Sequence, residues 1–238
     1  MLIDRNTDFQ EGQVLLFDKP LYWTSFDLVK KLKNIISNTY GYKKIKVGHA
    51  GTLDPLASGL MIICTGKSTK RINELQESNK EYLATFHLGK TTLSFDLETE
   101  FDGSYETDHI DNDLMINALR HFEGEYDQIP PVFSAKNIRG KRAYDYARKG
   151  INVELEAKRV IFHELELLKF DPPEAIIRIL CSKGTYIRSF ARDLGEYLDS
   201  GAYLSGLERT AIGDYKLEDA MQIRNFELLL NSFSNRDK

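Results

Sequence analysis

Cysteine and long apolar runs are both scarce in this sequence. The 238 residues include two cysteines, which lie inside the apolar runs LMIIC (60–64) and IIRILC (176–181). Cysteines so placed predict buried thiols rather than a disulfide framework, which is typical of a reducing compartment. No apolar run approaches the ~20 residues that cross a bilayer, and the polar N-terminus excludes a secretory signal peptide. We therefore expect a cytoplasmic protein without a membrane span.

Three common kinds of catalytic site lack their sequence signals here. None of the five histidines lies within three to five residues of another histidine or of a cysteine, so no zinc-type spacing occurs. The segment TGKSTK (65–70) matches the end of a phosphate-binding loop, but Met61 stands where that pattern needs its first glycine. A nucleotide triphosphatase is therefore disfavoured. No G-x-S-x-G elbow supports a Ser–His–Asp triad.

Charge is distributed unevenly along the chain. The formal net charge is −4, and 42% hydrophobic with 29% charged residues is typical of a globular protein. Residues 1–71 contain 11 Lys/Arg and six Asp/Glu, whereas residues 72–128 contain three and 14. Residues 136–150 hold six basic residues and one acid, interleaved with aromatic residues in a pattern that suits RNA. A solvated face would also explain these charges, so composition alone leaves both interpretations open.

Hydrophobic periodicity predicts a mixed α/β protein. Ser25 is the expected N-cap of a helix over 25–38, whose buried stripe is Phe26, Val29, Leu32 and Ile36. Further helices are expected over 68–79, 114–122, 141–150, 185–198 and 218–230. Strands are expected over 13–18, 60–64, 81–89, 151–157, 158–170, 174–183 and 203–215.

The order of these elements predicts the fold class and the domain boundaries. Strands and helices do not alternate strictly, so the central sheet is expected to be mixed, largely antiparallel and flanked by helices. We expect an N-terminal extension over 1–12 and one catalytic domain over 13–230. The acidic stretch 91–112 is expected to be an irregular excursion from that domain.

The segment GHAGTLDPLASG (48–59) surrounds one carboxylate, Asp54, with small residues and turn formers. Asp before Pro is common in turns, so a simple turn is one interpretation. The other is that the bare loop lets a large ligand approach the Asp54 carboxylate. His49, flanked by glycines, lies in the same accessible loop.

Three further segments combine with this loop. Tyr82 opens the strand in KEYLATFHLG, Arg188 lies early in the helix of CSKGTYIRSFARDLG, and FSAKNIRGKRAYDYARKG is basic and aromatic. Each segment alone has a structural explanation, as a core aromatic, a solvated arginine and a charged surface. Together, the acid, the tyrosine, the arginine and the basic-aromatic segment fit an enzyme that acts on RNA.

These four segments, in this order, resemble the TruB family of tRNA pseudouridine synthases from about Gly12 to about residue 228. The resemblance implies a pseudouridine-synthase catalytic domain that isomerises a uridine in the T-loop of tRNA, at position 55. It implies no cofactor, no metal and no obligatory protein partner, and we expect a monomer acting on the T-arm of tRNA.

The resemblance also implies roles for individual residues. Asp54 would be the catalytic aspartate, Tyr82 would stack on the target uracil, and Arg188 would pair with Asp54. His49 would help to displace T-loop nucleotides and Lys19 would support the site. The remaining candidates for substrate binding are Asp96, Gly51, Thr52, Lys136, Arg142, Tyr144, Arg148, Lys183 and Tyr186.

The chemistry leaves several routes open. The carboxylate could attack the sugar, attack the base or accept the C2′ proton, and the sequence does not choose among them. A uridine in a folded loop must first be extruded, at a cost of a few kcal/mol that stacking on Tyr82 would partly offset.

The sequence departs from the family pattern in three places. Tyr22 stands where the family usually has glycine, Leu93 breaks the usual T-D-T-x-D loop before Asp96, and we expect no C-terminal PUA-type domain. The departures at Tyr22 and Leu93 are compatible with an alternative, an RNA-binding or RNA-folding module whose catalysis is dispensable. A catalytic subunit of a guide-RNA particle is a third interpretation, and the expected lack of a C-terminal domain argues against it.

Overall fold

The computed structural model describes residues 3–133, 137–138, 141–142 and 155–234, and it divides into two compact units. The first unit contains the chain up to Lys80 and again from Glu208, and the second is Glu81–Leu207. Strand β12 (Ala202–Ile212) runs from the second unit into the first. The prediction of one catalytic domain over 13–230 stays a prediction.

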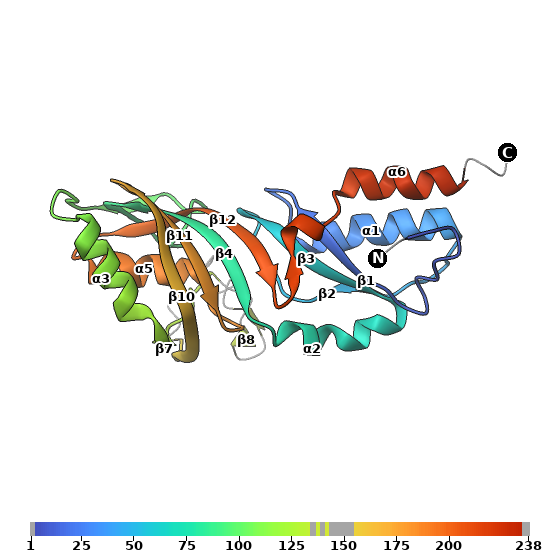
Figure 1. Ribbon diagram of the computed structural model, residues 1–238, viewed down its shortest axis with the longest axis horizontal. Helices are drawn as coiled ribbons and strands as arrows, with labels where there is room; N and C mark the ends of the chain where they lie inside the picture. Colours follow the sequence, from blue (N-terminus) through green and yellow to red (C-terminus); the bar gives the residue numbers. More distant parts are fainter. Residues whose placement is uncertain (1–2, 134–136, 139–140, 143–154, 235–238) are drawn as a thin grey trace. The chain divides into compact units, whose positions relative to one another are not determined.

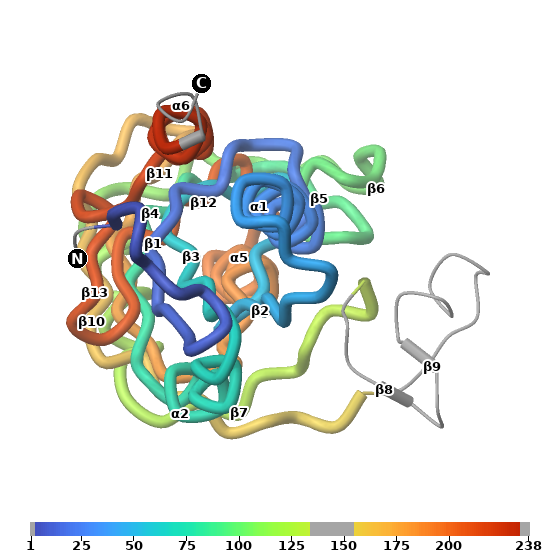
Figure 2. The backbone as a smooth tube through the Cα atoms, turned by 90° about the vertical axis from the view of Figure 1, so that its right-hand side faces the viewer, coloured from blue at the N-terminus to red at the C-terminus, as the bar shows by residue number. Residues whose placement is uncertain are grey.

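The first unit contains a small antiparallel sheet, in which β3 lies between β1 and the end of β12. The β1–β3 register pairs Lys19 with Gly59, at the end of β1 and near the start of β3. Helices α1 and α6 lie side by side (Figures 1 and 2). The elements are β1 (Val14–Lys19), α1 (Ser25–Tyr40), β2 (Val47–His49), β3 (Ala57–Thr65), the 3-10 helix η1 (Gly66–Arg71), α2 (Ile72–Gln76), β13 (Tyr215–Lys216), the 3-10 helix η2 (Leu217–Asp219) and α6 (Ile223–Ser234).

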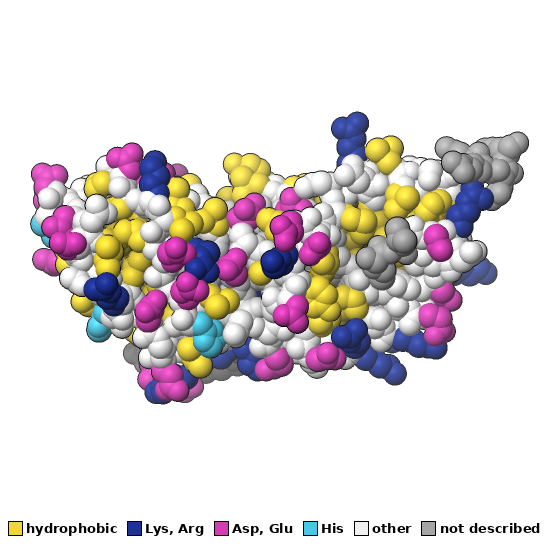
Figure 3. Space-filling model, in the orientation of Figure 1, with side chains coloured by type: hydrophobic (Ala, Val, Ile, Leu, Met, Phe, Trp, Pro, Cys, Tyr) yellow, Lys and Arg dark blue, Asp and Glu magenta, His cyan; other side chains and the backbone are white. Residues whose placement is uncertain are grey.

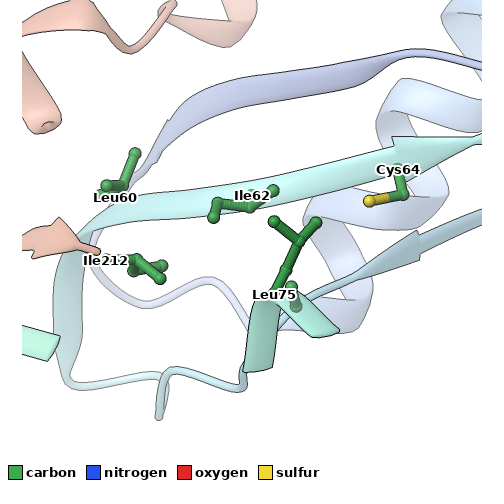
Figure 4. Close-up of a cluster of buried hydrophobic side chains, with 6 residues drawn as sticks. Leu60, Ile62, Cys64, Leu75 and Ile212 are labelled. Atoms are coloured by element: carbon green, nitrogen blue, oxygen red, sulfur yellow. The ribbon is translucent and has the colours of Figure 1, made fainter. Parts of the chain in front are cut away.

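Strand β3 carries the core of the first unit. Alternate β3 side chains, Leu60, Ile62 and Cys64, pack with Leu75 of α2 and Ile212 of β12 (Figure 4). Burying a large aliphatic side chain contributes about 1.5–3 kcal/mol, so this cluster fixes the strand that follows the Asp54 loop.

The N-cap of helix α1 lies one residue earlier than the sequence predicts. Thr24, not Ser25, is the N-cap, and its hydroxyl and the Asp27 carboxylate form a capping box. The expected buried stripe is wrong at Phe26, which is 70% exposed. The buried face follows 3.6-residue spacing through Leu28, Val29, Leu32, Ile35 and Ile36, and this face is turned away from Phe26.

The second unit is built on the strand order β12-β4-β11-β10-β7. Strands β10 and β11 pair antiparallel, as do β10 and β7, so the prediction of a mixed, mostly antiparallel α/β fold is confirmed. The elements are β4 (Lys80–Leu88), β5 (Lys90–Thr92), β6 (Phe101–Ser104), α3 (Asn112–Phe122), β7 (Gly124–Gln128), β8 (Asn137–Ile138), β9 (Lys141–Arg142), β10 (Lys158–Asp171), β11 (Glu174–Cys181) and α5 (Ile187–Tyr197).

Aromatic rings hold α5 against the sheet of the second unit. The Phe190 ring of α5 meets the rings of Phe86, Phe122 and Phe162 at centroid distances of 5.6, 5.4 and 4.9 Å. Such contacts add about 0.5–1.5 kcal/mol each beyond burial. They fix the helix that carries Arg188 two residues earlier.

One sequence expectation changes in the second unit, and two others lie mostly outside the described residues. The acidic stretch 91–112 is less irregular than expected, because β5 and β6 pair as an antiparallel hairpin. The predicted helix over 141–150 lies outside the described residues except for the backbone of β9, and most of the expected strand over 151–157 lies outside them as well.

Surface and burial give two further observations. Both cysteines are buried free thiols, as predicted. Within the described part of the chain, no helix is long and apolar enough to cross a membrane.

Hydrophobic side chains gather on the surface over α3 and β10, where Ile116 and Leu168 line a groove (Figure 3).

Candidate active site

The Asp54 loop is anchored through its backbone on both sides of the acid. The buried Ser25 hydroxyl accepts a hydrogen bond from the Leu53 amide and donates one to the Leu53 carbonyl, both at 2.9 Å. The Tyr22 amide donates to the Pro55 carbonyl at 2.7 Å. These bonds hold the backbone on either side of Asp54, whose half-buried carboxylate projects from a fixed turn.

A buried arginine secures the other half of the loop. Arg209 of β12 is 1% exposed, and its guanidinium donates to the carbonyls of Leu60, Thr52 and Gly51 at 2.8, 3.4 and 3.3 Å. A planar fork of donors suits three carbonyls that converge on it, two from the loop and one from β3. Gly51 and Thr52 therefore contribute carbonyl groups to the framework of the loop.

Close packing explains why two positions of the loop are glycine. A Cβ at Gly59 would lie 2.5 Å from the Arg209 carbonyl oxygen, and the φ of +102° also disfavours a side chain there. A Cβ at Gly48 would lie 2.7 Å from the Ile72 side chain. Packing within the protein therefore explains part of the shortage of large side chains in this loop.

Lys19 supplies a second buried cation in the same unit. Its side chain is fully buried, and Nζ donates to the carbonyls of Pro20 and Trp23 at 3.0 and 2.7 Å. Burial lowers the pKa of Lys19 to about 8, attraction to Asp54 opposes the drop, and repulsion from Arg209 adds to it. The Lys19 ammonium group and the Asp54 carboxylate therefore attract each other within the first unit.

His49 lies at the end of β2, where its backbone pairs with Ile63. Burial lowers the pKa of His49, and repulsion from Arg209 acts in the same direction. Burial therefore favours the neutral imidazole. A neutral ring in a half-buried position can pack against a base without adding a charge to the loop.

In the second unit, Arg188 and Asp96 form a buried ion pair. Arg188 Nε lies 3.6 Å from Asp96 Oδ2, and both side chains are 6% exposed. The Arg188 guanidinium also donates to the Phe133 carbonyl at 2.8 Å. The Glu98 amide donates to Asp96 Oδ1 at 2.9 Å, which fixes the carboxylate. Asp96 therefore orients the Arg188 side chain.

The other candidates of this unit lie on β4 and at the start of α5. Tyr82 is a buried residue of β4. Tyr186 is the N-cap residue of α5, and its backbone exchanges two hydrogen bonds with the buried Gln128 side chain, at 2.8 and 3.1 Å. Lys183 is exposed just before the helix.

Known proteins resemble this chain over most of its length. The model of the TruB family pseudouridylate synthase N-terminal domain matches residues 38–187, more than half of the chain. The chain belongs to the TruB family. It is 60% identical over 219 residues to tRNA pseudouridine synthase B of Phocaeicola vulgatus, covering 92% of this chain and 93% of that protein. It is 55% identical to the protein of that name from Bacteroides thetaiotaomicron, covering 92% and 93%.

Solved structures extend the likeness of this TruB-family chain to the fold. A chain in the crystal structure of a Cbf5–Nop10–Gar1 complex matches with a TM-score of 0.74 at 26% identity, covering 97% of this chain. A chain in the structure of an H/ACA RNP bound to a substrate RNA matches with a TM-score of 0.70 at 25% identity, covering 97% of this chain. The TruB-family chain spans 57% and 56% of those two chains.

The structure places the predicted residues of this TruB-family chain in two groups. The first unit joins Lys19, His49, Gly51, Thr52 and Asp54 around one loop. The second unit holds the others that the structure describes, namely Tyr82, Asp96, Lys183, Tyr186 and Arg188. The pairing of Arg188 with Asp54 stays a prediction. Three candidates, Lys136, Tyr144 and Arg148, and the side chain of Arg142 lie outside the described residues.

Sequence reasoning missed three residues that support candidate site residues within their own unit. Arg209 is the first, and the only signal for it was a cation in the interior of a predicted strand. Ser25 is the second, because the sequence predicts a helix cap there and gives no sign of its hydrogen bonds to Leu53. Gln128 is the third, and its position just before two prolines gave no sign of its contact with Tyr186.

Proposed function

We propose that this protein isomerises uridine to pseudouridine in tRNA, at position 55 in the T-loop, in the cytoplasm and as a monomer. The observation that carries the proposal is Asp54, a half-buried carboxylate on a loop that Ser25 and Arg209 fix through its backbone. Curated relatives that are 55–60% identical carry the name tRNA pseudouridine synthase B, which supports the same activity.

The isomerisation breaks the bond between uracil N1 and ribose C1′ and forms a bond between C5 and C1′. The C5 proton is released, N1 gains a proton, and no oxidant or cofactor is consumed. Asp54 acts on the ribose or on the base during this exchange. The buried Lys19 and Arg209 cations place positive charge near the loop, and a rigid loop keeps the carboxylate aimed at the nucleoside.

Extrusion of the uridine precedes this chemistry. Tyr82 stacks on the flipped uracil, and His49 displaces neighbouring T-loop nucleotides. Arg188, oriented by Asp96, pairs with the charge that Asp54 carries. The cost of unstacking is a few kcal/mol, and a single base–aromatic stack of about 1–3 kcal/mol offsets much of it.

The remaining candidates bind the RNA around the target. Lys183 and Tyr186 contact the T-arm beside α5, and Lys136, Arg142, Tyr144 and Arg148 contact its phosphates and bases. Gly51 and Thr52 act through their carbonyl groups, which fix the loop that receives the nucleotide.

The decisive experiment replaces Asp54 and a matched acid in the same unit. Product is measured as tritium released from [5-³H]uridine-labelled tRNA, and binding is measured separately with the same tRNA. Asp54→Asn is expected to lower the rate by about 10³-fold or more while binding persists. Asp18→Asn, a half-buried acid whose carboxylate accepts from Gln222, is expected to retain activity. Normal tritium release by Asp54→Asn would refute the role of the carboxylate.

A further inference from the structure

Tyr22 combines an unfavourable backbone conformation with a nearly free side chain. Its φ is +68°, in the left-handed region that favours glycine, and its side chain is 74% exposed. A glycine would adopt this conformation without steric cost, so the backbone gives no reason for a tyrosine. The ring also buries too little surface to stabilise the core. What it can do is contact something outside the protein.

The position of Tyr22 joins it to the Asp54 loop. Its amide donates to the Pro55 carbonyl at 2.7 Å, so its backbone contacts the residue after the proposed catalytic acid. Leu21 and Phe26 are also exposed, at 43% and 70%. Exposed apolar residues beside a functional loop are typical of a binding surface.

The exposed side of α1 adds positive charge to this surface. Phe26, Lys30 and Lys33 are spaced i, i+4 and i+7, and all three are exposed, so they form one stripe along the helix. The stripe extends about 10 Å along the helix axis. Aromatic rings followed by lysines are the chemistry that binds unpaired nucleotides, because rings stack on bases and ammonium groups contact phosphates.

We propose that Tyr22 stacks on an unpaired base of the substrate RNA next to the target uridine, and that the Phe26–Lys30–Lys33 stripe continues the contact along the adjoining strand. The proposal rests on the proposed function for the identity of the RNA. RNA would contact both kinds of side chain, because its bases stack on the rings and its phosphates bind the lysines. A protein partner would account for the exposed rings but not for the lysines.

Binding of a fluorescently labelled T-arm hairpin tests the proposal, in an Asp54→Asn background that prevents turnover. Tyr22→Gly is expected to weaken binding about tenfold, as loss of one base–aromatic stack does, whereas Tyr22→Phe keeps the ring and stays within about twofold. Leu228→Ala, which trims another exposed apolar side chain of the first unit, is the control and is expected to bind normally.

Thermal unfolding separates a binding role from a structural one. Tyr22→Gly releases an unfavourable φ, so its melting temperature is expected to equal or exceed that of the parent protein. Unchanged RNA binding by Tyr22→Gly, or an equal loss in Tyr22→Phe, would overturn the stacking role. Failure of the Asp54→Asn protein with Tyr22 intact to bind the hairpin would also overturn it. If the protein with Asp54 intact binds the hairpin but forms no pseudouridine, the proposed function fails while the Tyr22 series still decides this inference.

Discussion

The buried ammonium group of Lys19 leads to a pH-dependent prediction about stability. The pKa falls from the ordinary value of 10.5 to about 8 in the folded protein, chiefly because of burial. At a pH where Lys19 is charged in both the folded and the unfolded state, that drop lowers the unfolding free energy by about 3 kcal/mol. The other charges that act on Lys19 are Asp54, Arg209, Asp18 and Asp27.

The sign follows from proton binding. Between pH 8 and 10.5 the unfolded lysine holds its proton while the folded lysine has released it, so the unfolded state binds more protons. The unfolding free energy due to Lys19 therefore rises with pH through this window. From about pH 7 to about pH 9.5, the expected gain is about 2 kcal/mol.

Urea unfolding of the protein and of Lys19→Met at several pH values measures this gain. Methionine fills a similar volume without a titratable group, so the difference between the two proteins isolates Lys19 from tyrosines and other groups that titrate in both. The unfolding free energy of the unsubstituted protein is expected to rise by about 2 kcal/mol relative to Lys19→Met between those pH values. A difference that stays constant with pH would refute the reasoning.

Two other predictions concern buried arginines. Arg209→Lys replaces a planar fork of donors with one ammonium group, so we expect the unfolding free energy measured in urea to fall by about 2 kcal/mol. We also expect a lower kcat with little change in RNA affinity. An unchanged kcat would contradict the role of Arg209 in positioning the Asp54 loop. Arg188→Met leaves Asp96 buried without its ion-pair partner and should lower the unfolding free energy by about 3 kcal/mol. The double variant with Asp96→Leu should recover part of that loss, and no recovery would show that the pair is not coupled.

Local patterns were sufficient for most of the element types. Helices α1, α3 and α5 and strands β1, β3, β4, β10 and β11 lie where periodicity predicts them. These elements bury one face or one stripe, and hydrophobic spacing records that requirement directly. The N-cap of α1 differs from the prediction, because Thr24 rather than Ser25 forms a capping box with Asp27.

Individual burial was less predictable than element type. Helical spacing predicts Phe26 in the buried stripe of α1, but Leu28 and Leu32 define the buried face and leave Phe26 in solvent. The hairpin of β5 and β6 was also missed, because an acidic segment with little apolar alternation gives no strand signal.

By itself, the sequence determined the family, the mixed α/β class and the candidate acid. The loop around Asp54 and the three other motifs are continuous segments of the chain, so they can be recognised without the tertiary structure. Only the tertiary structure decided what holds that acid. Arg209 reaches the Thr52 carbonyl across 157 positions of the chain, and Lys19 is buried with its charge coupled to Asp54. Such contacts depend on which strands become neighbours, and a buried cation has the same letter in the sequence as a solvated one.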